Sequence, residues 1–121
     1  MAMTAGRKLR RDLDAELRKA GTAQGHVLVW SAREVAAIDA AVQAADHVEV
    51  LLARFDIAAA GDPGDMSVAA ALCKLSAEIR QHRRTIADMV ARLEFGPGKA
   101  KSDRHVRSAQ ARWNREGHVM S

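Results

Sequence analysis

The chain has 121 residues, enough for one domain with tails, and its 19 Lys and Arg against 15 Asp and Glu give a net charge of +4. With two Trp, two Phe, no Tyr and no alternating β-branched runs, the composition argues against a sheet and favours helices. No run of 18 apolar residues and no signal-peptide core is present, so we expect a cytoplasmic protein without a membrane partner. The single cysteine, Cys73, excludes an internal disulfide and is predicted to be a buried or half-buried hydrophobe on a helix.

The charge is unevenly distributed along the chain. Residues 1–20 carry six basic and three acidic groups, residues 99–121 carry six and two, and the part between them has an excess of acid. We therefore divide the chain into a basic N-terminal helix with a linker (1–26), a central helical-hairpin oligomerisation core (27–96) and a basic C-terminal tail (97–121).

The first predicted helix is short and amphipathic, because Leu9, Leu13 and Leu17 recur every four residues among charged side chains. Gly21 is expected to end it, since glycine tolerates the left-handed conformation found at helix ends.

A long helix is predicted over about 31–60, because Ser31 and Glu34 have the spacing of a capping box at its start. Two apolar stripes run along this segment, which indicates two packing partners. We expect one stripe to face the first helix or a neighbouring subunit and to form the oligomer interface. Its members are Ala37, Ala41, Ala44, Val48 and Leu51.

A second long helix is predicted over about 67–95, with Asp65 or Ser67 as its cap and a heptad-like apolar seam that includes His82. The short Gly/Pro turn before it makes the two long helices antiparallel neighbours. A register centred on Pro63 predicts an ion pair between Asp46 and Arg80 across this hairpin. So long and thin a hairpin cannot bury both apolar faces, which indicates an all-α protein that self-assembles.

The segment GPGKAKS at residues 96–102 resembles a phosphate-binding loop but lacks its requirements. Leu93 stands where the first glycine is needed, Ala100 stands where Ser or Thr is needed, and a predicted helix precedes the segment in place of a strand. The five histidines show no His-x-x-x-His spacing and no Cys-x-x-Cys motif occurs, so no metal site is expected. We therefore predict no catalytic residue, no cofactor and no enzyme activity.

Two basic clusters carry the functional prediction, because Lys and Arg neutralise phosphates and an aromatic ring can stack on a base. We predict that they contact double-stranded DNA. A solubilising tail and docking of a protein partner through Trp113 are the alternatives. The predicted DNA-contacting residues are Arg7, Lys8, Arg10 and Arg11 before the first helix, and Lys99, Lys101, Arg104, Arg107, Arg112 and Arg115 in the tail around Trp113.

The central and C-terminal segments resemble the small terminase subunits of actinobacterial phages and prophages. The resemblance lies in VWSARE at residues 29–34 with AAD at 44–46, in AEIRQHRR at 77–84 with ARL at 91–93, and in the ending AQARW at 109–113. It implies a ring-forming homo-oligomer that binds the viral genome and recruits and regulates a large subunit, which holds the ATPase and nuclease. The family's frequent N-terminal helix-turn-helix does not fit into the thirty or so residues before the hairpin.

The sequence thus predicts a small terminase subunit of a double-stranded DNA phage or prophage, acting in the bacterial host cytoplasm. Two alternatives come from other functional classes. A coiled-coil adaptor or scaffold protein predicts a dimer without DNA affinity, and a small nucleoid-type DNA-binding protein predicts DNA affinity without a ring or a large-subunit partner.

Overall fold

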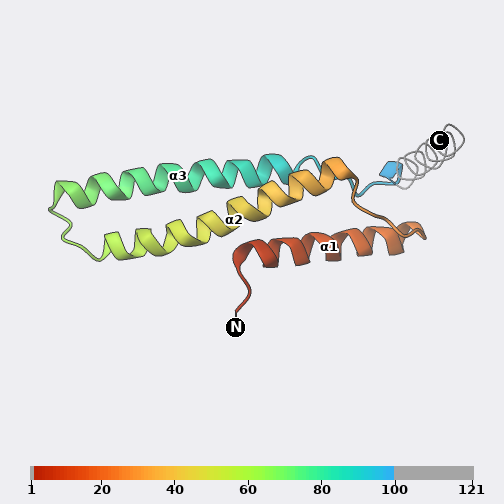
Figure 1. Ribbon diagram of the computed structural model, residues 1–121, viewed down its shortest axis with the longest axis horizontal. Coiled ribbons are helices and arrows are strands. Elements are labelled where there is room, and N and C mark those ends of the chain that lie inside the picture. Colours follow the sequence, from red (N-terminus) through yellow and green to blue (C-terminus); the bar gives the residue numbers. More distant parts are fainter. Residues whose placement is uncertain (1, 100–121) are drawn as a thin grey trace, which may run out of the picture. The chain divides into compact units, whose positions relative to one another are not determined.

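The structure is a computed structural model that describes residues 2–99, and this part of the chain holds three helices and no strand. The helices are α1 (Ala5–Gln24), α2 (Ala32–Ala59) and α3 (Met66–Val90) (Figure 1). The all-α prediction is therefore confirmed for these residues. None of the described helices combines the length and the apolar character needed to cross a membrane.

Helix α1 differs from its prediction at both ends. It begins at Ala5, where the Thr4 hydroxyl accepts a hydrogen bond from the Arg7 amide, so the basic cluster lies within the helix and not before it. It also continues through Gly21, which was predicted to end it. The helix ends before Gly25, whose φ of 72° is the left-handed conformation that glycine supplies at a helix end.

Helix α2 begins and ends within one residue of its predicted bounds, whereas α3 is shorter than predicted. Asp65 caps α3, and its side chain accepts a hydrogen bond from the Ser67 amide. The helix ends at Val90 and not near residue 95. After it, the Leu93 amide donates to the Val90 carbonyl, so a tight turn in place of α-helix leads to Gly96.

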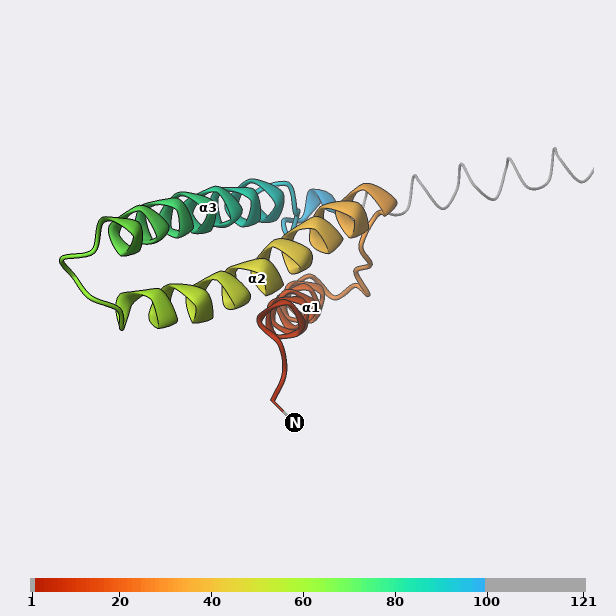
Figure 2. The ribbon, with the colours of Figure 1, turned by 60° about the vertical axis from the view of Figure 1, so that its left-hand side comes forward.

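The described residues form two compact units, which do not follow the division made on charge. The first contains residues 2–12 and 32–93 and the second contains 13–31 and 94–99, so their boundary falls inside α1. In the first unit α2 and α3 lie side by side and antiparallel (Figures 1 and 2). Their core is made by Val48, Leu51 and Ile79, with Phe55, Leu75 and Ile86 packed against it.

The register of α2 against α3 differs from the one centred on Pro63. That register places His47 opposite Ile79, but the His47 ring contacts His82, with 5.1 Å between the ring centroids and the rings nearly edge to face. The predicted ion pair between Asp46 and Arg80 is not among the ion pairs of the described residues. Asp46 instead accepts a hydrogen bond from α1, so this prediction is wrong.

The second unit is organised around Trp30. Its indole N–H donates to Asp14 Oδ1 at 2.8 Å, and its ring meets Phe95 edge to face at 5.6 Å. The ammonium of Lys99 lies 5.2 Å from the centre of the same ring, in a cation–π arrangement. The Gln24 side chain donates to the Phe95 carbonyl. These contacts join the end of α1 to the segment that follows α3.

Candidate functional site

The first candidate feature is the start of α1, which is held against α2 by two carboxylates. The Gly6 amide donates to Asp46 Oδ1 at 2.7 Å, and the Ala5 amide donates to Glu49 Oε2. The first amides of a helix have no partner within the helix, and its N-terminus carries partial positive charge, so both carboxylates stabilise α1 in this position.

The approach of α1 to α2 requires a glycine at position 6. A Cβ added there would lie 2.6 Å from the Val42 carbonyl oxygen and 2.7 Å from Asp46 Oδ1. The first of these is a backbone atom and cannot turn away. The buried Gly6 therefore sets the distance at which the basic start of α1 passes α2.

The sequence interpretation missed this anchor, although a signal for it exists. Asp46 and Glu49 are three residues apart and therefore lie on one side of α2. Two carboxylates spaced in this way can accept hydrogen bonds from the free amides at the start of another helix. The sequence alone does not identify that helix. Asp46 was paired with Arg80 of α3 because the register centred on Pro63 places these two residues opposite each other.

The four basic residues predicted near the N-terminus all lie on α1, in differing environments. Arg7, Lys8 and Arg11 are exposed, and the Arg11 guanidinium lies 3.3 Å from the carboxylate of its neighbour Asp12. Arg10 is half-buried, with its guanidinium 3.8 Å from Asp39 of α2. Three exposed cations thus stand within two turns of an anchored helix start.

Of the predicted tail residues, the structure describes Lys99 alone. Its side chain is buried over Trp30, with 2% of its surface exposed, so it does not face a polyanion in this arrangement. Trp113 and the other basic tail residues lie outside the described residues. They are Lys101, Arg104, Arg107, Arg112 and Arg115.

The alanine-rich stripe predicted as the oligomer interface is core within the single chain. Ala41 is fully buried, and the other four members are at most 8% exposed. Small side chains let neighbouring backbones approach closely, which fits this position. Because these side chains are already covered within the chain, they are not available to a second subunit. The four others are Ala37, Ala44, Val48 and Leu51.

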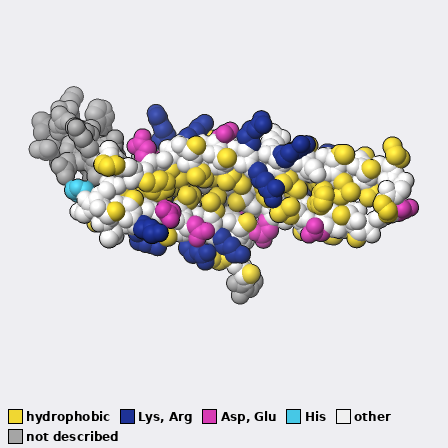
Figure 3. Space-filling model, turned by 180° about the vertical axis from the view of Figure 1, so that it is seen from behind, with side chains coloured by type: hydrophobic (Ala, Val, Ile, Leu, Met, Phe, Trp, Pro, Cys, Tyr) yellow, Lys and Arg dark blue, Asp and Glu magenta, His cyan; other side chains and the backbone are white. Residues whose placement is uncertain are grey.

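The second candidate feature is the open end of the α2–α3 pair, which we define as residues 50–83. Its apolar side chains are widely exposed: Val50 by 51%, Ile57 by 77% and Met66 by 83%. Hydrophobic side chains gather on the surface of this pair in the view of Figure 3. Exposed apolar side chains that cluster on one surface are typical of interaction sites.

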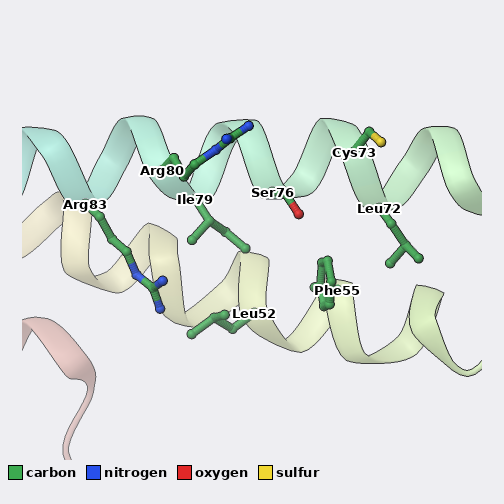
Figure 4. Close-up of a pocket in the computed structure, with 8 residues that line it drawn as sticks. All are labelled: Leu52, Phe55, Leu72, Cys73, Ser76, Ile79, Arg80 and Arg83. Carbon is green, nitrogen blue, oxygen red and sulfur yellow. The ribbon is translucent and has the colours of Figure 1, made fainter.

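A groove of about 550 Å³ lies within this open end, between α2 and α3. Figure 4 shows Leu72, Ile79 and Arg83 extending from α3 toward α2, where Leu52 and Phe55 lie. Cys73 stands at its rim and is exposed, so the prediction that this cysteine is buried or half-buried is wrong. The α3 surface around it is simply left uncovered by the rest of the described chain.

The described residues show little that resembles reactive chemistry. Residues 2–99 hold no group of three His, Cys, Asp or Glu side chains arranged to bind a metal ion. One carboxyl group titrates unusually: the Ser67 hydroxyl, and then the Ser67 amide, hold the pKa of Asp65 below its ordinary value. That carboxylate caps α3 and has a structural role.

No protein-family model matches this chain, and neither a curated protein nor a solved structure is significantly similar to it. Function is therefore inferred from the two features above and from the residues of the sequence.

Proposed function

We propose that this chain is the small terminase subunit of a double-stranded DNA phage or prophage, which assembles into a ring, binds viral DNA and recruits and regulates the large ATPase and nuclease subunit. It acts in the host cytoplasm, without catalysis or a cofactor of its own. The observation that carries the proposal is one unit holding both an uncovered apolar end and a set of exposed cations on an anchored helix.

The apolar end supports the assembly part of the proposal. Fully burying a side chain of this size is worth about 1.5–3 kcal/mol, and a monomer forgoes about half of this at Val50 and most of it at Ile57 and Met66. In the part of the chain that the structure describes, Ile79 is the single buried residue of α3, although this helix is 25 residues long. A helix pair covered on so few sides gains stability when further copies pack against it.

The start of α1 supports the DNA part of the proposal. Arg7 and Arg11 are four residues apart, on one face of the helix, and Lys8 adjoins them. The first backbone amides are occupied by Asp46 and Glu49, so phosphate contact falls to the side chains. In a ring these cations recur at every subunit, which multiplies a weak single contact.

The first test measures the mass of the purified protein in solution by light scattering, together with its binding to double-stranded DNA over a salt titration. A single closed assembly of many subunits with salt-dependent DNA affinity supports the proposal. A dimer without DNA affinity favours the adaptor or scaffold alternative. DNA affinity without a large assembly favours the nucleoid-type alternative.

A second test reverses charge at Arg7, Lys8 and Arg11 together, by substitution with Glu. Because each lost phosphate contact lowers the salt slope of binding by about 0.9, we expect weaker binding and a shallower slope. The matched control reverses three exposed cations in α3 and in the turn that follows it, and it should retain the slope. Its positions are Lys74, Arg84 and Arg92.

A third variant reverses the charge of Arg104, Arg107 and Arg112. It distinguishes DNA contact by the tail from DNA contact by α1. If only this variant lowers the slope, DNA contact belongs to the tail. If neither triple variant changes binding, the assignment of DNA contact to the basic clusters is overturned.

A further inference from the structure

One contact between α2 and α3 is made by two imidazole rings. His47 of α2 and His82 of α3 lie with their ring centroids 5.1 Å apart and their planes at 70° to each other. Imidazole is the commonest protein ligand for metal ions, and it suits zinc and the other late first-row divalent cations. Two imidazoles held side by side provide half of a tetrahedral zinc site.

The separation of the rings is that of two imidazoles bound to one ion. Because Zn–N bonds are about 2.0–2.1 Å long, tetrahedral coordination places the centroids of two bound rings about 5 Å apart. The observed distance agrees with this value. The χ2 torsion of histidine has a broad range, so rotation of each ring can aim one nitrogen at a shared point without a change in the backbone.

The surroundings of the pair leave room for an ion and supply no further ligand. His47 is exposed and His82 is half-buried, so solvent reaches the rings without an opening of the core. The nearby carboxylates of Asp46 and Glu49 accept hydrogen bonds from the start of α1. Within residues 2–99 no third His, Cys, Asp or Glu side chain completes a metal-binding group, so water would take the other positions.

We propose that His47 and His82 together bind one late first-row divalent metal ion, such as Zn²⁺, and that this ion joins α2 to α3. The ion has a structural role, because its two protein ligands come from the two helices of the hairpin. The proposal goes beyond the proposed function and depends neither on assembly nor on DNA.

An ion at this place reinforces a contact that few side chains support. Among the described residues Ile79 is the single buried residue of α3, and His82 follows it by three residues, on the same side of the helix. Because the two rings are apart in the unfolded chain, an ion that binds both favours the folded state. At a free-ion concentration 100 times the dissociation constant, the folding equilibrium shifts about a hundredfold.

The pair has no signature within either helix. Metal-binding histidines on one helix are recognised by a short spacing such as His-x-x-x-His, and the prediction that the chain has no metal site used such spacings. His47 and His82 meet because of the register in which α2 packs against α3.

The test is a Zn²⁺ titration followed by the NMR signals of the histidine rings. It uses the Cys73→Ser protein, because the exposed thiol of Cys73 is itself a zinc ligand. We expect the signals of His47 and His82 to change together with one ion per chain, and a chelator to reverse the change. Mg²⁺, which prefers oxygen ligands, should leave both signals unchanged.

Single variants identify the ligands. His47→Ala and His82→Ala should each weaken Zn²⁺ binding at least about tenfold, because each leaves one imidazole in place of two. The matched control His26→Ala removes an exposed histidine outside α2 and α3 and should keep the affinity. Circular dichroism checks that each variant keeps its helices.

The outcomes decide whether the two rings act together. A joint change of both signals that each single variant weakens supports the proposal. A change at one ring alone overturns it, as does an affinity that survives in both His47→Ala and His82→Ala and therefore belongs to other ligands. A titration in which neither ring responds also overturns it and shows that the rings only pack against each other.

Thermal unfolding gives an independent reading. Zn²⁺ should raise the Tm of the Cys73→Ser protein by several degrees and leave the Tm of both histidine variants unchanged. An equal rise in all three proteins would show that the ion stabilises the fold from another place.

Discussion

The two parts of α2 have opposite surroundings. Its buried residues all fall between Glu34 and Leu51, whereas residues 52–59 contain none in the described structure. The helix is continuous across this boundary, and apolar side chains occur on both sides of it. Both parts of α2 therefore have the same kind of sequence pattern, and they differ in how many described helices pack against them.

The difference shows what a single chain can and cannot stabilise by itself. The first part of α2 is packed by α3 and meets the start of α1 through Asp46 and Glu49. Beyond that point, within residues 2–99, α3 is the single helix that packs against α2. The first part is then expected to respond to mutation through folding, and the second through association.

The largest expected effect comes from Leu51→Glu. Leu51 is 6% exposed in the core with Val48 and Ile79, and an unpaired carboxylate there costs about 3 kcal/mol or more of unfolding free energy. Denaturant unfolding followed by circular dichroism measures the loss. The matched variant Leu52→Glu changes a side chain that is 39% exposed in the groove, and it should keep the fold but lower the mass in solution.

The adjacent positions 51 and 52 directly test the difference between the two parts of α2. If both variants lost the same unfolding free energy, the boundary within α2 would be wrong. If Leu52→Glu assembled as the unmodified protein does, the groove would not be an association surface.

The next effect is expected at the contact between α1 and α2. Gly6→Ala places a Cβ against the Val42 carbonyl, and we expect a loss of about 1–3 kcal/mol, although alanine favours a helix over glycine by about 1 kcal/mol. Thermal unfolding measures it. The control Gly96→Ala has open space within 4 Å and should leave the transition unchanged. A more stable Gly6→Ala variant would mean that α1 does not approach α2 as described.

A smaller effect is expected from Asp46→Ala, which removes the acceptor of the Gly6 amide. Loss of a capping carboxylate typically costs about 1 kcal/mol. Faster hydrogen exchange at the Gly6 amide would locate the loss at the start of α1. Asp88→Ala, at an exposed position of α3, is the control. Unchanged exchange at Gly6 would remove Asp46 from the anchor.

Local patterns allowed the helices to be predicted, because apolar periodicity and caps are read within a few turns. The bounds of α2 were correct to within one residue for this reason, and the cap of α3 is Asp65, one of its two predicted candidates. The partner of Asp46 was wrong, since a displacement by three residues along α3 preserves the apolar pattern and leaves the register undetermined. The predicted start of α1 was wrong because the residues that anchor it, Asp46 and Glu49, are distant in the sequence.

The same limit applies to the candidate site. The alanine stripe was predicted to face the first helix or a neighbouring subunit, and its pattern could not decide between them, because burial by the chain's own helices gives the same pattern. The sequence also placed Cys73 in the interior, since a helix seam does not reveal which of its positions lack a neighbour. Sequence periodicity identifies apolar faces, and the three-dimensional arrangement decides which are already covered.

The smallest effect is expected at the cap of α3, where the Ser67 hydroxyl and amide lower the pKa of the Asp65 carboxyl. A carboxyl group with a lowered folded-state pKa stabilises the protein above its unfolded pKa, and this contribution disappears as the pH falls through the folded value. Because Asp65 is fully exposed, screening by solvent keeps this effect on stability small. Because its pKa is lowered, the effect appears only at acid pH. The Ser67→Ala variant should raise the pKa of Asp65 toward its ordinary value in a carboxyl NMR titration, and the signal of exposed Asp88 should stay unchanged. An Asp65 titration that is the same in both proteins would show that the Ser67 hydroxyl does not donate to Asp65 in solution, and the cap would then rest on the Ser67 amide alone.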